Sequence, residues 1–172
     1  MPDIQTEVRK RRTFAIISHP DAGKTTLTEK LLLYGGAIQL AGTVKGRKAT
    51  RHARSDWMAL EQERGISVTS SVMQFPYRDH IVNLLDTPGA PDYLGKSIAV
   101  LPAVETAAVV VNARTGIEPV AIRMMLRAAE RGLCRLIIIN RIDVEEVELE
   151  ALLEELKQTF GQECLPLNLP AD

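Results

Sequence analysis

The sequence predicts an α/β fold with a mostly parallel sheet. Apolar runs that suit buried strands alternate with segments of helical period, and this alternation is typical of strand–helix–strand units. Three of these runs end in short polar motifs that contain Gly, Lys, Asn or Asp. The 172 residues are enough for one domain with a sizeable hydrophobic core. We therefore expect one α/β domain, spanning residues 1–172, with polar motifs at the ends of its strands.

The elements are expected in a regular order along the chain. Strands are predicted near residues 13–17, 67–76, 79–85, 106–112 and 134–139. Helices are predicted over about 24–34, 93–103, 118–131 and 146–160.

The last two predicted helices have recognisable ends and apolar faces. Pro119 lies in the first turn of one, and Gly132 follows its end. Its apolar face comprises Ile122, Met125, Leu126 and Ala129, while Met124 and Met125 are interpreted as core packing. The final helix ends at Gly161, and its apolar face comprises Leu149, Leu152, Leu153, Leu156 and Phe160.

A polar motif follows the first strand and opens the first helix: Ser18-His19-Pro20-Asp21-Ala22-Gly23-Lys24-Thr25-Thr26. In such a loop Gly23 permits close backbone approach to a phosphate, Lys24 supplies a positive charge, and Thr25 supplies a hydroxyl for Mg²⁺. Ser18 stands where this pattern usually begins with glycine, so the match is incomplete. A pattern this short also arises by chance, and its interpretation depends on the rest of the chain.

Two further motifs favour a nucleotide site. Asp86 follows the strand at 79–85, where its carboxylate can hold Mg²⁺ through water, and Gly89 can offer its N–H to a γ-phosphate. Asn140, Arg141 and Asp143 follow the strand at 134–139. A carboxylate at Asp143 can accept two hydrogen bonds that guanine donates and adenine does not. The alternative for Asp143 is a simple helix N-cap, but three motifs in this order, each after an apolar strand, favour guanine recognition.

Composition places few limits on partners. With 45% hydrophobic and 25% charged residues the chain has the composition of a globular protein, and its net charge of −1 gives no overall attraction to nucleic acid. There is no signal-peptide core or membrane-spanning run, so we expect a cytoplasmic protein with neither DNA nor a membrane as partner. Cys134 and Cys164 lack metal-ligand spacing and are expected to be reduced, with Cys134 in a buried strand.

Residues 35–65 show no sustained periodicity and are expected to form a long loop. Its cations precede the first acidic residue, Asp56, and are Lys45, Arg47, Lys48, Arg51 and Arg54. One interpretation is a solvated basic loop. The other is a segment that orders around a γ-phosphate and presents its charge to nucleic acid.

The motifs resemble those of translational GTPases. From about Arg11 to Gly89 the chain is similar to the GTPase domain of bacterial peptide chain release factor 3, which shares the phosphate-loop motif, the segment Lys45–Arg54, Ser55-Asp56-Trp57 and Glu63-Arg64-Gly65-Ile66-Ser67. From about residue 90 to 172 it is similar to elongation factor G and its paralogues, including Phe160-Gly161 and the stretch 165–170. An engineered chimera and a divergent paralogue would both give this pattern.

The resemblance implies a three-layer P-loop NTPase fold, a Ras-like G domain, truncated before its last strand and helix. It implies GTP or GDP and Mg²⁺ as ligands, with phosphates and metal held by Asp21, Ala22, Gly23, Lys24, Thr25 and Thr26. Ser67 matches a switch I hydroxyl that coordinates Mg²⁺ together with Thr25 and Asp86. Residues 35–65 would be the switch I loop, whose Lys45–Arg54 segment suits ribosomal RNA at the factor-binding site of the ribosome.

Departures from the family put catalysis in question. Ala90 stands where relatives carry the His that positions the attacking water, and such a loss typically removes on the order of 10²–10⁴ in rate. His19 and His80 are expected to be structural or exposed, which leaves Lys24 and Gly89 as stabilisers of the γ-phosphate. The sequence therefore predicts GTP binding with very slow turnover. A binding module without hydrolysis, a fragment that binds nothing tightly and an adenine-specific ATPase are the alternatives, the last opposed by Asp143.

Overall fold

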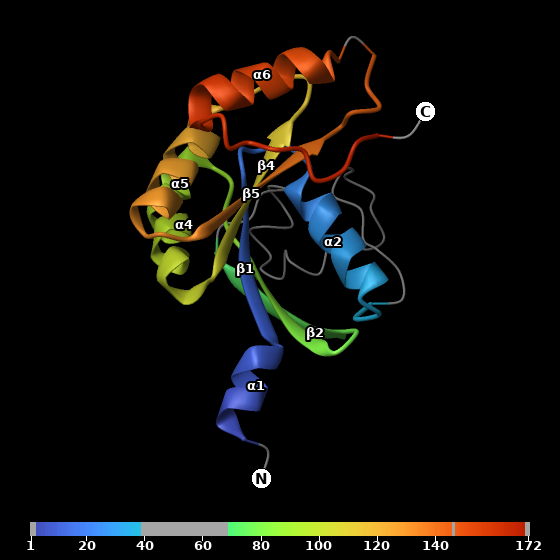
Figure 1. Cartoon of the computed structure of the whole chain (residues 1–172), viewed down its shortest axis with the longest axis vertical. Helices are drawn as coiled ribbons and strands as arrows, with labels where there is room; N and C mark the ends of the chain where they lie inside the picture. The colour runs from blue at the N-terminus through green and yellow to red at the C-terminus, as the bar shows by residue number, and fades with distance from the viewer. Residues whose placement is uncertain (1–2, 39–68, 146, 171–172) are drawn as a thin grey trace.

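The structure is a computed structural model that describes residues 3–38, 69–145 and 147–170. One sheet contains five strands in the order β2–β3–β1–β4–β5 (Figure 1). Their bounds are β1 Arg11–Ser18, β2 Ser71–Tyr77, β3 His80–Asp86, β4 Thr106–Asn112 and β5 Cys134–Asn140. β1 runs parallel to β3 and β4, β5 runs parallel to β4, and β2 pairs antiparallel with β3. The predicted α/β fold with a mostly parallel sheet is confirmed.

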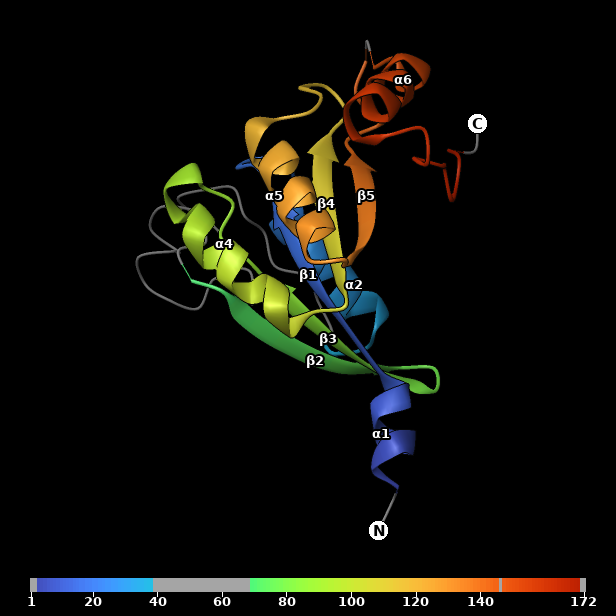
Figure 2. The ribbon, with the colours of Figure 1, turned by 60° about the vertical axis from the view of Figure 1, so that its left-hand side comes forward.

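Helices cover both faces of the sheet, with α2 on one face and α4 and α5 on the other (Figure 2). The α-helices are α1 Ile4–Lys10, α2 Lys24–Tyr34, α4 Leu94–Val100, α5 Pro119–Glu130 and α6 Leu149–Phe160. Short 3₁₀ turns, η1 Pro91–Tyr93 and η2 Leu101–Ala103, flank α4 where a single helix over 93–103 is predicted from the sequence. Both flanking turns contain a proline, which cannot continue a helix by donating an N–H. Because helices lie on both faces of the sheet, the predicted three-layer arrangement is confirmed.

The central strands supply the core of both layers because their side chains alternate between the faces. Ala15 and Ile17 of β1 lie in the cluster under α4 and α5, whereas Ile16, between them, lies in the cluster under α2. All three side chains are fully buried. Burial on both faces explains why these strands read as continuous apolar runs, and it fixes the end of β1 that leads into the phosphate loop.

Two details of burial differ from the sequence predictions. Cys134 is exposed because it begins β5, the edge strand of the described sheet, so the expectation of a buried position was wrong. Leu126 and Ala129 of α5 also face outward. The small side chains of Ala121 and Ala128 instead let α5 approach the sheet, and its buried face comprises Val120, Ala121, Met124, Met125 and Ala128.

The predicted face of α6 is confirmed, with Leu152 and Leu156 buried and the other three apolar residues half-buried. Among the described residues, no helix combines the length and the apolar character needed to cross a membrane. The described sheet and helices account for all five predicted strands and all four predicted helices, while α1 has no counterpart in the prediction.

Candidate functional site

The polar motifs meet at the carboxyl edge of the parallel strands. β1 ends at Ser18 and leads into the phosphate loop, β3 ends at Asp86, and β5 ends at Asn140. Because β1, β3 and β5 run in the same direction, their carboxyl ends lie at one edge of the sheet. Clefts outside this edge are where open α/β sheets bind ligands.

The loop between β1 and α2 is built around two left-handed residues. Asp21 has φ +62° and Gly23 has φ +90°, and the Ala22 N–H donates to the His19 carbonyl at 3.3 Å. Gly23 occupies the N-cap of α2 without a side-chain hydrogen bond to the helix. The first turn of α2 therefore presents N–H groups that Gly23 does not cap, which suits an anion. Within this turn Thr25 is half-buried and Thr26 is exposed.

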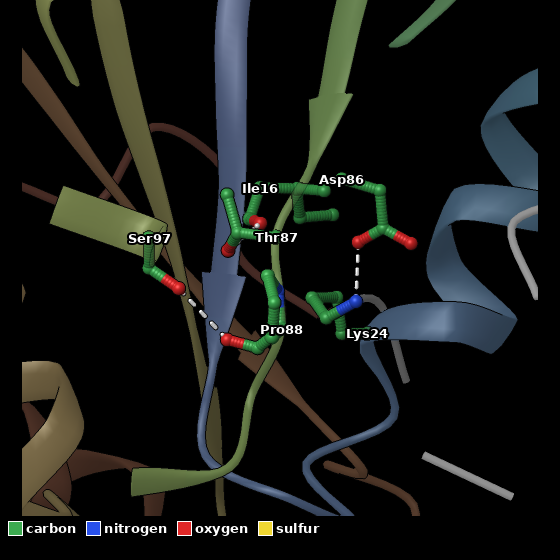
Figure 3. A network of polar contacts seen from close by, with 6 residues as sticks. All are labelled: Ile16, Lys24, Asp86, Thr87, Pro88 and Ser97. Carbon is green, nitrogen blue, oxygen red and sulfur yellow. Dashed lines mark hydrogen bonds and ion pairs between the residues drawn. The ribbon is translucent and has the colours of Figure 1, made fainter. Parts of the chain in front are cut away.

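Lys24 and Asp86 form a buried ion pair at the centre of the site (Figure 3). The exposed fractions of their side chains are 5% and 1%. The ammonium contacts Oδ1 of Asp86, while Oδ2 is buried and has no hydrogen-bond partner among the described residues. A buried carboxylate oxygen without a donor is costly, so this atom marks a place where a further cation or donor would be stabilised.

The segment after β3 is fixed on two sides (Figure 3). The N–H and Oγ1 of Thr87 both donate to the Ile16 carbonyl, at 3.3 and 2.9 Å. Oγ of Ser97 in α4 donates to the Pro88 carbonyl at 2.9 Å. Gly89 then passes so close to the phosphate loop that a Cβ added there would lie 3.0 Å from the Ser18 carbonyl oxygen. The two predicted phosphate-binding segments are thus in direct contact.

The segment after β5 also contacts the phosphate loop. Nδ2 of Asn140 donates to the Ala22 carbonyl at 2.8 Å. A Cβ at Gly23 would collide with this amide, so glycine is required there for steric reasons as well as for its positive φ. Nε of Arg141 lies 4.0 Å from the same Cβ position, so the guanidinium group of Arg141 lies beside the loop.

Asp143 lies exposed in the turn after Arg141, so its carboxylate is accessible to a ligand. It does not cap the following helix, because α6 begins at Leu149 with Glu148 as its N-cap. The alternative interpretation of Asp143 as a helix N-cap was therefore wrong.

Two histidines, His19 and His80, lie in the described part of the chain. Nε2 of His19 lies 3.8 Å from Oε1 of Glu118, at the start of α5, and its Nδ1 is buried without a partner in the described part of the chain. His80 begins β3, at the end of the sheet opposite the phosphate loop. Ala90 itself is the N-cap of η1 and offers no side-chain hydrogen bond.

Some predicted site residues lie outside the described part of the chain, and some residues of the observed site were not predicted. Ser67 and the Lys45–Arg54 segment lie outside the described residues, as does most of the 35–65 loop. Thr87, Ser97 and Glu118 were not predicted to support the site. Thr87 and Ser97 hold the segment after β3 in place through hydrogen bonds, and Glu118 lies beside His19. Thr87 belongs to the Asp-Thr-Pro-Gly motif and was a detectable candidate. A lone serine within a helix gives no comparable signal.

Comparisons with known proteins agree with this geometry. Over residues 9–168 the sequence matches the family described as the elongation factor Tu GTP binding domain. A crystal structure of a protein from Thermus thermophilus is similar, with a TM-score of 0.78 and 34% sequence identity. The similarity covers 87% of this chain and 22% of that protein, so this chain spans about a fifth of its length.

Proposed function

The chain belongs to the elongation factor Tu GTP-binding domain family, and we propose that it binds GTP and GDP with Mg²⁺ and turns GTP over very slowly. The predicted translational GTPase G domain is confirmed by the family match and by the fold. The observation that carries the proposal is the convergence of three segments on one loop. Lys24, Asp86 and Asn140 all meet at the turn between β1 and α2.

The residues at this turn fit a nucleotide phosphate. Lys24 is a buried cation beside the uncapped first turn of α2, so both a charge and backbone N–H groups serve an anion there. Gly89 would add its N–H from the adjacent segment. Ser18, Asp21, Ala22, Gly23, Thr25 and Thr26 form the rest of the proposed phosphate site. Stabilisation of the γ-phosphate would come from Lys24 and the Gly89 N–H.

The same site fits Mg²⁺. Oδ2 of Asp86, which has no hydrogen-bond partner among the described residues, is an oxygen acceptor of the kind this ion prefers, directly or through its waters. The hydroxyls of Thr25 and Ser67 would complete the protein's contribution. When bound, the metal would neutralise charge on the phosphates. Lys24 and Asp86 hold each other in place in the described structure, which keeps both groups oriented toward the loop.

Guanine preference is assigned to the segment after β5. Asn140 holds the phosphate loop through Ala22, Arg141 would lie along the base through its methylene stem, and Asp143 would accept the N1 and N2 hydrogens of guanine. Arg141 stands where lysine is usual, so we expect weaker binding with unchanged guanine preference. The accessibility of Asp143 supports this role, since a carboxylate used as a helix cap would be less available.

Slow turnover follows from Ala90. A methyl group neither accepts a proton from water nor orients it. His80 lies at the end of the sheet opposite the phosphate loop, and the His19 imidazole lies beside Glu118. A second candidate function is therefore a GTP-dependent binding module that performs no useful hydrolysis. In either case we propose a cytoplasmic translation factor whose Lys45–Arg54 segment contacts ribosomal RNA.

Titration of a fluorescent GDP analogue into the chain with Mg²⁺ tests nucleotide binding. Displacement by GDP but not by ADP is expected. Asp143→Asn should weaken GDP binding by roughly 10²-fold, because hydrogen bonds to a charged acceptor are lost. Glu150→Gln, the same change at an exposed position of α6, is the matched control and should have no effect. Equal displacement by ADP, or equal effects of the two variants, would contradict guanine recognition.

Phosphate release under multiple turnover tests the role of Ala90. The chain is expected to show almost no release, and Ala90→His should raise the rate on the order of 10²-fold or more. GDP binding should stay unchanged in this variant. Rapid turnover by the unmodified chain would remove the argument for impaired catalysis while leaving nucleotide binding intact.

A further inference from the structure

A cluster of cations lies at the end of the sheet opposite the phosphate loop. It combines the end of α1 and the start of β1 with the turn between β2 and β3, which lie side by side (Figures 1 and 2). The register confirms this proximity, because Arg11 pairs with Ile81 and Tyr77 pairs with His80. We call this the amino-edge surface, and its cations are Arg9, Lys10, Arg11, Arg12 and Arg78.

These cations are exposed and only partly neutralised. Lys10 and Arg11 share one carboxylate, Glu7, at 3.8 and 3.9 Å, and their side chains are 50% and 46% exposed. The Arg12 guanidinium donates to the Arg9 and Arg11 carbonyls, both at 2.7 Å. In the described ranges no carboxylate pairs with Arg9, Arg12 or Arg78. Asp3, Glu7, Asp79 and Glu105 are the nearby acids, the last accepting from the Thr13 N–H at 3.2 Å, so five cations face four carboxylates and the surface keeps a small positive excess.

An aromatic–guanidinium pair lies beside the cations. Cζ of Arg78 stands 5.4 Å from the centroid of the Tyr77 ring, and Tyr77 is 48% exposed. Arg78 occupies the left-handed region, φ +51°, in the two-residue turn between β2 and β3, and it is exposed. Nucleic-acid bases stack both on aromatic rings and on guanidinium planes.

We propose that the amino-edge surface binds single-stranded RNA. Its cations would contact successive phosphates, and one base would stack on the Tyr77–Arg78 pair. A single strand offers both phosphates for the cations and unpaired bases for the exposed Tyr77 ring. A membrane is a poorer fit, because α1 offers only Ile4 and Val8 as exposed apolar side chains, too few to anchor a membrane helix.

This contact is separate from the nucleotide site. Arg11 and Ser18 are seven steps apart along β1, which corresponds to roughly 23 Å. RNA at the amino edge would therefore leave the phosphate loop accessible. The proposal does not rest on nucleotide binding and can hold if that function fails.

Fluorescence anisotropy with a labelled 12-nucleotide RNA tests the proposal on the whole chain at low salt. Arg9→Ala/Arg12→Ala/Arg78→Ala should weaken binding about tenfold or more and make the slope of log K against log salt shallower by about 2, as expected for three lost phosphate contacts. Tyr77→Ala should weaken binding about fivefold or more through lost stacking. The charge-matched control is Arg123→Ala/Arg127→Ala/Arg131→Ala, all exposed on or after α5. It should change the affinity less than twofold.

Additional measurements test whether the RNA binds instead at the Lys45–Arg54 segment or at the nucleotide site, or whether the surface binds a membrane. The losses caused by the amino-edge variants should be equally large when Lys45→Ala/Arg51→Ala/Arg54→Ala is also present, and excess GDP with Mg²⁺ should not displace the RNA. A loss confined to that loop variant, displacement by GDP, or equal losses in the α5 control would overturn the proposal. Binding to phosphatidylserine vesicles without binding to RNA would also overturn it. Unchanged urea unfolding of each variant ensures that a lost affinity reflects the surface.

Discussion

The two ends of β1 hold charged groups in opposite surroundings. At the Ser18 end, Lys24 and Asp86 are almost fully buried and contact each other directly. At the Arg11 end, Glu7 meets two cations only at 3.8 and 3.9 Å, and all three side chains are more than a third exposed. Burial rises along the strand between these ends. A buried charge must have its partner in the protein, whereas an exposed charge is satisfied by water. Stability should therefore depend on both Lys24 and Asp86 but little on Glu7.

The largest effect on stability is expected from breaking the buried pair. Lys24→Met leaves the Asp86 carboxylate buried without its cation, and removal of one partner of such a pair costs about 3–5 kcal/mol. Urea unfolding of the nucleotide-free chain measures this loss. It should be accompanied by loss of GDP binding, because the same ammonium serves the proposed phosphate site.

The double variant Lys24→Met/Asp86→Asn separates the two roles. Since neither position of the pair then carries a buried charge, most of the lost stability should return, while GDP binding stays absent. If the single variant were as stable as the unmodified chain, the pair would not be a buried structural contact.

An intermediate effect is expected at Ser97, which is buried but uncharged. Ser97→Ala removes the donor to the Pro88 carbonyl and leaves that acceptor unsatisfied, which costs about 1–3 kcal/mol. The same hydrogen bond holds the Asp86–Gly89 segment against α4, so GDP affinity should also fall. Ala99→Ser, at an exposed position of the same helix, is a control that should change neither quantity. If Ser97→Ala lost as much stability as Lys24→Met, the expectation that a buried charge matters more than a buried neutral hydrogen bond would be wrong.

Site residues could be predicted from the sequence where a strand pattern and a polar motif are adjacent along the chain. The apolar run at 14–17 predicts a buried strand, and the motif that follows predicts a loop at its end, so Lys24 and Asp86 were placed without a structure. Ser97 could not be identified in this way, because its role depends on Pro88, which lies nine residues away at the end of another element.

Burial of surface elements was less predictable because it depends on neighbours that the local pattern does not contain. Cys134 reads as part of an apolar run, yet its position at the sheet edge exposes it. α1 buries no residue and so lacks an apolar period, although Asp3 caps it by accepting from the Gln5 N–H at 3.3 Å. Local capping explains the helix, but that signal alone is too common to predict one.

The smallest effect is expected at Glu7, on the exposed side of the comparison. Glu7→Gln removes the carboxylate shared by Lys10 and Arg11, yet the free energy of unfolding should change by no more than about 0.5 kcal/mol, because exposed pairs of this length contribute little. RNA affinity should rise instead, since the amino-edge surface loses one of its four acids. The same urea and anisotropy measurements test both expectations. A large loss of stability would mean that this end of β1 depends on its charges as the Ser18 end does, and weaker RNA binding would count against phosphate contacts at Lys10 and Arg11.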